Sequence, residues 1–136
     1  MRQLKPVVVQ EESCALEGWD DPTIGKVMWR TLLSGDRTPT AGLTVGVAEI
    51  GPGHRETSFP HRHEPAEVYY FLAGEGVVTI DGSEYPVRTG STVFIPGNAW
   101  HATRNTGHAV LRLLYAFAVD SFAQVAYEFP DPSASD

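Results

Sequence analysis

The sequence predicts an all-β fold, either a sandwich or a barrel, and three observations support this class. Apolar and polar residues alternate with a period of two in several segments, as in residues 42–50. Turn-forming residues recur about every ten positions, a spacing typical of sandwiches and barrels. Helical periodicity is missing from most of the chain, although residues 11–16 are compatible with a short helix.

The predicted strands are short and are separated by glycine, proline, asparagine or aspartate. They span residues 24–33, 42–50, 67–72, 77–80, 84–87, 91–95, 110–119 and 123–129. Asp81 and Gly82 predict a type I′ turn between two of them, because both central residues of that turn need a positive φ. The order therefore consists of antiparallel hairpins rather than strand–helix–strand units.

Length and composition indicate one globular domain over residues 1–136. The chain has 136 residues, of which 42% are hydrophobic, enough to form a core without disulfides. The core is expected over about 20–129, with 130–136 as a flexible tail rich in proline and small polar residues.

Charge and hydropathy exclude several classes of partner. The net charge of −7 argues against nucleic acids and anionic membranes as partners. The longest apolar stretch, residues 110–119, contains Arg112 and is too short to cross a bilayer. We expect no signal peptide at the N-terminus, and the single cysteine, Cys14, suits a reducing cytoplasm.

Two groups of histidines near strand ends predict a metal site. His61 and His63 are two residues apart, so on an extended backbone their rings lie on one face. Glu67 opens the next strand, and His101 follows another strand after a Pro-Gly-Asn turn. Imidazoles with one carboxylate suit Fe(II), Mn(II), Ni(II) or Zn(II). A lone His-x-His pair is more often a solvated turn, and the second group is what favours a site.

The spacing of both groups resembles the two motifs of the cupin superfamily. The first motif pairs two histidines with a glutamate and a glycine, here His61, His63, Glu67 and Gly74. The second joins a glycine, proline, histidine and asparagine, here Gly90, Pro96, His101 and Asn105. The chain departs from the pattern at Arg55 and Asn98, where glycines are usual. Asn98 replaces glycine best at positive φ, so that turn is expected to survive.

The resemblance implies a jelly-roll barrel, or double-stranded β-helix, with one divalent metal inside it. It also implies that His61, His63, Glu67 and His101 are the ligands. Strand parity adds one residue independently: if Glu67 points to the metal, Tyr69 and Phe71 point inward as well. Tyr69 is then either an aromatic lining of the cavity or a functional hydroxyl close to the metal.

Within the superfamily, several segments resemble the small lyases that cleave dimethylsulfoniopropionate. The stretches that carry this resemblance are residues 42–53, 63–69, 95–101 and 120–127. It implies that Tyr69 acts as the base and that Tyr127 is a second active-site tyrosine. The implied reaction is β-elimination from a small carboxylate bound to the metal, with Trp100, Tyr69 or Phe71 as a cation–π face for a sulfonium group.

Two other functions remain open at the level of the sequence. An Fe(II) dioxygenase would use the same ligands with O2 as co-substrate, and a non-enzymatic cupin would only bind a small ligand. The sequence does not decide among the three, because one barrel supports many activities. Surplus apolar residues and exposed strand edges lead us to expect a homodimer.

Overall fold

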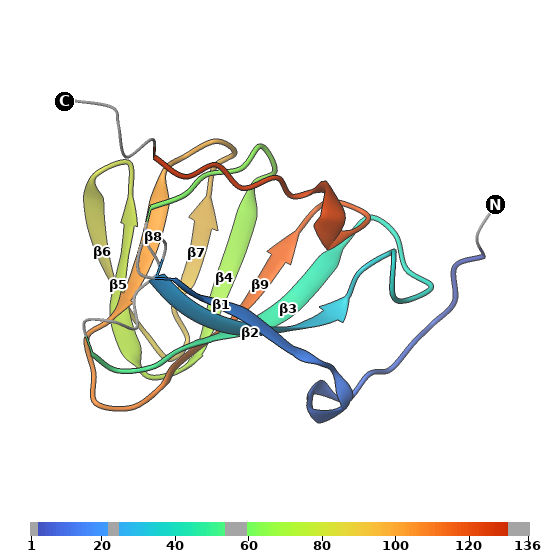
Figure 1. Cartoon of the computed structure of the whole chain (residues 1–136), viewed down its shortest axis with the longest axis horizontal. Helices are drawn as coiled ribbons and strands as arrows, with labels where there is room; N and C mark the ends of the chain where they lie inside the picture. The colour runs from blue at the N-terminus through green and yellow to red at the C-terminus, as the bar shows by residue number, and fades with distance from the viewer. Residues whose placement is uncertain (1–2, 22–24, 54–59, 131–136) are drawn as a thin grey trace.

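The computed structural model describes residues 3–21, 25–53 and 60–130 and is built almost entirely of β-strands (Figure 1). The elements in these ranges, in chain order, are η1 (Glu11–Ser13), β1 (Leu16–Asp21), β2 (Gly25–Leu33), β3 (Thr44–Ile50), β4 (Glu67–Ala73), β5 (Glu75–Ile80), β6 (Ser83–Arg88), β7 (Thr92–Ile95), β8 (His101–Asn105), β9 (Leu111–Phe117) and η2 (Phe122–Gln124). The all-β prediction is confirmed.

The strands form two antiparallel sheets that face each other across the interior. The larger sheet has six strands in the order β1-β2-β3-β9-β4-β7, and the smaller has the order β6-β5-β8. Consecutive strands β7 and β8 lie in different sheets, and so do β4 and β5. β4 therefore belongs to the larger sheet and β8 to the smaller one. Their first residues, Glu67 and His101, approach each other from these two sheets.

Alternation along β4 and β8 decides which side chains reach the interior. In β4 the side chains of Glu67, Tyr69 and Phe71 are buried, whereas the residues between them are exposed. This pattern confirms the parity predicted from the sequence. In β8 the buried positions are His101, Thr103 and Asn105.

Two tight turns have the backbone geometry that their residues suggest. Asp81 and Gly82 have φ values of 48° and 85°, as a type I′ turn requires, and they join β5 to β6. Asn98, in the place where a glycine is usual, has φ 64° and donates its backbone N–H to the carbonyl of His63. The predicted survival of this turn is confirmed, and it ties the first histidine motif to the second.

Isolated pairings close the barrel beside the histidines. His61 exchanges two backbone hydrogen bonds of 2.9 Å with His101, so the two motifs are joined through their own backbone. Arg62 pairs in the same way with Glu128, which brings the C-terminal segment across this end. Side chains of that segment therefore lie close to the histidines.

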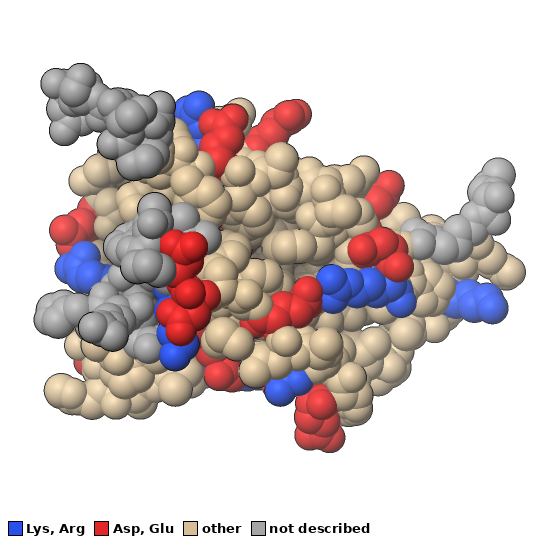
Figure 2. All heavy atoms as spheres, viewed as in Figure 1, with Lys and Arg blue, Asp and Glu red and all other residues tan. Residues whose placement is uncertain are grey.

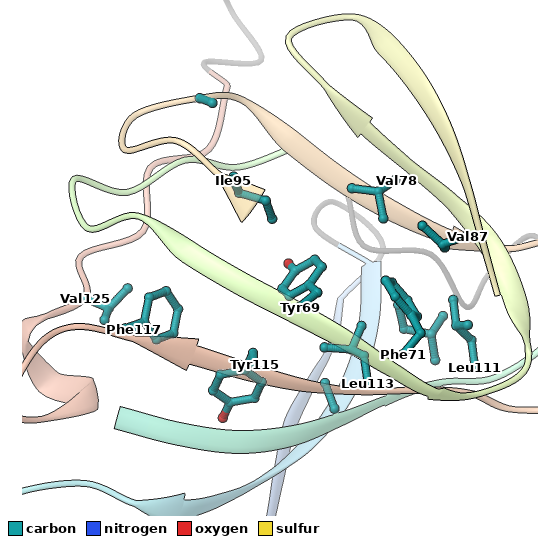
Figure 3. Packing of buried hydrophobic residues seen from close by; sticks show 13 residues of the cluster. Tyr69, Phe71, Val78, Val87, Ile95, Leu111, Leu113, Tyr115, Phe117 and Val125 are labelled. Atoms are coloured by element: carbon teal, nitrogen blue, oxygen red, sulfur yellow. The ribbon is translucent and has the colours of Figure 1, made fainter. Parts of the chain in front are cut away.

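Buried apolar residues fill the barrel on both sides of Tyr69 (Figure 3). On one side Phe71, Val78, Val87 and Leu111 pack together, contributed by both sheets. This packing holds β4 firmly, because an apolar side chain such as Phe71, which is 0% exposed, contributes about 1.5–3 kcal/mol when it is fully buried. Glu67, the first residue of β4, therefore lies on a strand that the core holds in place.

Three predictions about secondary structure need correction. Residues 123–129 are not a strand: the side chains of Ser121 and Gln124 form a capping box that starts the 3-10 helix η2. The strands β1 and β8 were not predicted, because β8 has only one apolar residue, Ala102, and β1 is short and acidic. The short helix expected near residues 11–16 is present as η1, although β1 already begins at Leu16.

The surface agrees with the acidic composition. Basic side chains do not gather into one patch on the face that Figure 2 shows. Among the described residues, no helix has the length and apolar character needed to span a bilayer. Most of the predicted tail, residues 131–136, lies outside the described ranges, and the single-domain assignment stays a prediction.

Candidate metal centre

The four predicted metal ligands come together in the barrel interior. His61 and His63 precede β4, Glu67 is the first residue of β4, and His101 is the first residue of β8. All four are buried, and one ring nitrogen from each of the three histidines lies within 4.8 Å of the others. Oε1 of Glu67 lies 3.3 Å from Nε2 of His63 and 3.4 Å from Nε2 of His101.

Backbone carbonyls orient two of the imidazole rings. Nδ1 of His63 donates to the carbonyl of Pro65 at 2.8 Å, and Nδ1 of His101 donates to that of Ala99 at 2.9 Å. A proton on Nδ1 leaves the lone pair of a neutral imidazole on Nε2. Second partners of this kind commonly fix the tautomer of metal-bound histidines. Both Nε2 atoms are thus set to act as ligands.

Unpaired polar atoms test whether a metal fits this arrangement. Nε2 of His63, Nε2 of His101 and Oε1 of Glu67 are buried and have no hydrogen-bond partner among the described residues. Their mutual distances are short, but their geometry does not form hydrogen bonds. Buried polar atoms without partners are rare, and each one calls for an explanation. A divalent cation fits, since the three atoms are unpaired potential ligands and the carboxylate oxygen lies 3.3–3.4 Å from both ring nitrogens.

Electrostatic coupling among these groups shifts their pKa values. Burial raises the pKa of Glu67, but the imidazoles of His101 and His63 outweigh this effect, and the pKa ends below its usual value. Burial alone lowers the pKa of His63, yet the Glu67 carboxylate reverses the shift and raises it. In the metal-free site the carboxylate is therefore charged and His63 holds its proton more tightly than an ordinary histidine. Protons and a metal compete for the same atoms.

Both predicted catalytic tyrosines lie beside these ligands. Tyr69 is 7% exposed, and its ring centroid is 6.4 Å from that of His101. Burial and then the negative charge of Glu67 raise the pKa of Tyr69 well above its usual value, whereas a hydrogen bond with Thr103 acts in the opposite direction. The ring of Tyr127 lies 5.3 Å from those of both His61 and His63.

A small cavity opens next to the ligands, bordered by His61, Glu67, Tyr69 and Tyr127. Its volume is about 60 Å³. Because a single water needs roughly 10–15 Å³ on this scale, the cavity has room for several water-sized groups and so for a small molecule. The site therefore suits a compact ligand, not a sugar chain or a nucleotide.

The remaining walls of the cavity include residues that the sequence analysis did not identify. They are mainly aromatic and come from β1, β2, β9 and η2: Trp19, Trp29, Tyr115 and Phe122. Alternation in the predicted strand 24–33 places Val27 and Trp29 on one face, a signal that pointed to Trp29. Nothing in the sequence alone shows that this face meets the metal site.

Two of the three residues predicted to offer a cation–π face do not border the cavity. Trp100 packs against the guanidinium of Arg62, whose Cζ lies 4.5 Å from the ring centroid, and Phe71 belongs to the apolar core. Tyr69 alone of the three is a cavity residue. His108 is exposed in a loop, whereas His54 and Arg55 lie outside the described residues.

Comparison with known proteins agrees with this site. The family described as "Cupin domain" (Cupin_2) matches residues 46–117. Dimethylsulfoniopropionate lyase DddW of Ruegeria pomeroyi is 44% identical over 124 residues, which cover 91% of this chain and 80% of that protein. Because the alignment leaves out only about a tenth of the chain, it also spans β1 and β2, which lie before the part that matches the family.

More distant relatives share the barrel but have other activities in their names. The 5-nitrosalicylic acid 1,2-dioxygenase of a Bradyrhizobium species is 34% identical over 68 residues, which are 50% of this chain and 32% of that protein. A predicted oxalate decarboxylase from Thermotoga maritima superimposes with a TM-score of 0.70 at 26% identity, covering 83% of this chain and 99% of that one. Together these matches confirm the predicted jelly-roll barrel.

Proposed function

This chain belongs to the cupin domain family, and on that premise we propose that it is a metal-dependent lyase. The proposed reaction is β-elimination from a small carboxylate such as dimethylsulfoniopropionate. The observation that carries the proposal is the 44% identity to a dimethylsulfoniopropionate lyase over 91% of the chain. The compact cavity beside the four predicted ligands supports a substrate of this size.

The metal would be held by His61, His63, Glu67 and His101, the residues whose ligand atoms converge. A divalent cation there supplies a positive charge that makes the C–H bonds next to a carboxylate more acidic. Fe, Mn, Ni and Zn are all compatible with three imidazoles and one carboxylate. The buried setting keeps bulk water away from these groups, because each ligand side chain is less than a tenth exposed.

Tyr69 is the proposed base. Its hydroxyl oxygen takes the proton from the carbon next to the carboxylate, and the C–H electron pair forms the C=C bond. The bond from the β-carbon to sulfur then breaks, and neutral dimethyl sulfide leaves with acrylate as the second product. Since burial and Glu67 raise the pKa of Tyr69 in the metal-free site, the phenolate requires a nearby positive charge. Thr103 favours the phenolate by hydrogen bonding.

Tyr127 is the proposed second functional tyrosine. Its ring contacts His61 and His63, and burial raises the pKa of its hydroxyl well above the usual value. We assign it to orienting the substrate as a neutral hydroxyl group. The distinction from Tyr69 rests on the contacts of the two side chains, because the hydroxyl of Tyr69 also interacts with Glu67 and Thr103.

The decisive experiment compares two reactions in one preparation of metal-loaded protein. With dimethylsulfoniopropionate and Mn(II) in the absence of oxygen, we expect release of dimethyl sulfide and acrylate. Oxygen uptake is measured in parallel with Fe(II) and a panel of carboxylates. Elimination that continues without oxygen supports the lyase. Oxygen consumption matched by substrate loss, with no sulfide released, would contradict it.

A dioxygenase is the second candidate, favoured by the relative from Bradyrhizobium and its 34% identity. That alignment covers 32% of the dioxygenase, so it supports a related domain more than a shared activity. A dioxygenase would need iron specifically, whereas the elimination tolerates several divalent metals. Metal substitution in these assays therefore separates the two candidates, because elimination should persist with Mn(II) whereas oxygen uptake should require Fe(II).

We also propose that the chain forms a homodimer. Val68, Tyr70 and Leu72 point away from the interior along β4, and Phe94 lies beside them on the edge strand β7 with 65% of its surface exposed. Burying such side chains favours association. Sedimentation velocity at micromolar concentration is expected to give twice the mass of the chain, and a monomer at all concentrations would contradict the proposal.

A further inference from the structure

The cavity has two chemically different ends. One end is bordered by His61 and Glu67 of the candidate metal site, and the other is a wall of indole rings from Trp19 and Trp29. Trp19 stands on β1 and Trp29 on β2, and their ring centroids are 5.0 Å apart in an edge-to-face arrangement with an interplanar angle of 70°. Both strands lie outside residues 46–117, the part that matches the cupin family.

A chain of ring contacts links the wall to the metal ligands. The ring of Trp19 lies 6.0 Å from that of Tyr127, which in turn lies 5.3 Å from both His61 and His63. A ligand anchored at the histidines and a few atoms long therefore meets Tyr127 and the indoles with its other end.

The charge of the wall decides which chemical group can occupy that end. Among the described residues that border the cavity, none is lysine or arginine, and Glu67 is the only carboxylate. A second anionic group would have no cationic partner there. Aromatic faces carry partial negative charge and attract cations, most strongly when the cation is shielded from water. Alkyl groups on such a cation also gain from contact with the rings.

We propose that Trp19 and Trp29 form the subsite for the onium end, an alkylated sulfonium or ammonium, of a short carboxylate. The carboxylate end lies at the metal-binding histidines. This inference rests on the proposed function for the type of substrate, but not for the reaction. It replaces the cation–π partners expected from the sequence, Trp100 and Phe71, which do not border the cavity.

The indole rings could also recognise a ligand through their N–H groups instead of through their faces. Nε1 of Trp19 and Nε1 of Trp29 are buried without a hydrogen-bond partner among the described residues. If these donors recognised the ligand, they would select an acceptor atom and not a cation. Phenylalanine keeps an aromatic face and removes the N–H, so substitutions by phenylalanine and by leucine separate the two explanations.

The experiment measures equilibrium binding by calorimetry to the metal-loaded protein. The two probes are 3-(dimethylammonio)propanoate and 4-methylpentanoate, which have the same branched shape and differ in one positive charge. We expect the cationic probe to bind on the order of tenfold more tightly. Equal affinity, or tighter binding of 4-methylpentanoate, would overturn the proposal without any variant.

Substitutions then show which residues are responsible for the difference in affinity between the two probes. Trp19→Leu and Trp29→Leu are expected to bring the affinity ratio of the two probes close to one, whereas Trp19→Phe and Trp29→Phe retain most of it. Trp100→Leu is the matched control, because Trp100 lies outside the cavity, and it should keep the original ratio. A ratio that survives both leucine substitutions, or is lost equally with phenylalanine, overturns the assignment.

The result is independent of turnover. A tenfold preference for the cationic probe in a protein that releases no sulfide would leave the subsite standing and remove the lyase. A working lyase that binds the two probes equally would support the proposed function and remove the subsite. Metal content is measured for each variant, so that loss of the cation is not mistaken for loss of the subsite.

Discussion

The two ends of the cavity differ in where they come from in the chain. The metal-binding end is built from His61, His63, Glu67 and His101, which all lie within residues 46–117, the part matched by the cupin family. The indoles of the aromatic end come from β1 and β2, and Phe122 comes from η2, all outside that part, whereas Tyr115 of β9 lies within it. Shared residues thus form the candidate metal site, and flanking strands shape the space beside it.

This division explains how relatives with different activities share one barrel. The dioxygenase relative aligns with 50% of this chain, whereas the dimethylsulfoniopropionate lyase aligns with 91%. The longer alignment takes in the strands that carry the indoles. On the proposals above, the metal end would define what kind of chemistry is available, and the aromatic end would define what the cavity accepts. Separate perturbation of the two ends tests this division.

The largest effect is expected from removing ligands at the metal end. The double substitution His61→Ala and His101→Ala takes away two of the three clustered imidazoles, and we expect the protein to lose stoichiometric metal and all elimination activity. Metal analysis of the purified protein is the measurement. His108→Ala, which removes an exposed loop histidine, is the matched control. Unchanged metal content in the double variant would remove the candidate site.

The next effect concerns the boundary between the two ends. Tyr69→Phe is expected to lower kcat by roughly 10²–10⁴-fold, the usual contribution of a general base, with metal content unchanged. Tyr127→Phe should cost less and act mainly on KM. Tyr70→Phe, on the exposed face of the same strand, is the control for Tyr69. Full turnover by Tyr69→Phe would show that Tyr69 only lines the cavity.

These two ends were also unequally predictable from the sequence. The convergence of the four candidate ligands was predictable because metal coordination imposes residue types at fixed spacings, and a period of two places Glu67 and Tyr69 on one face. That information is local. The strands predicted at 42–50 and 67–72 agree with the structure for the same reason, since each alternates clearly.

The aromatic end was missed because it depends on long-range pairing. Trp19 reaches the cavity only because β1 pairs with β2 at the edge of the larger sheet and crosses toward the C-terminal segment. Residues 123–129 alternate like a strand, but a single bridge at Glu128 and the capping box at Ser121 leave them without a partner strand. Such outcomes depend on which surfaces meet, and a sequence pattern does not contain that information.

A pH titration sharpens the account of the metal end. His63 must lose its proton to bind a metal, and Glu67 raises its pKa, so metal affinity should begin to fall at a higher pH than for an ordinary histidine. From pH 7.5 to 5.5 the loss is at least roughly tenfold for this one residue. Glu67 has a lowered pKa and stays ionised over this range. Competition with a chelator measures the affinity, and a flat profile would contradict the assignment of His63 as a ligand.

The smallest effect tests how β1 is held in place at the aromatic end. Glu17 of β1 accepts two hydrogen bonds from Arg37, of 2.8 and 3.0 Å, and one of 2.9 Å from Thr31. The Arg37 side chain is 45% exposed, so Arg37→Ala should lower the free energy of unfolding by only about 0.2–1 kcal/mol. Arg104 is exposed to the same degree, 46%, and pairs with the more exposed Glu84 in the smaller sheet, so Arg104→Ala is the control.

If the two ends are independent, Arg37→Ala leaves metal content unchanged, because none of the metal-site residues contacts this pair. It should nevertheless weaken binding of the cationic probe slightly, since Glu17 is two residues from Trp19 on the same face of β1. Arg104→Ala should cost similar stability without affecting that binding. Equal effects of both substitutions on the probe would mean that overall stability, and not the position of β1, controls the aromatic end.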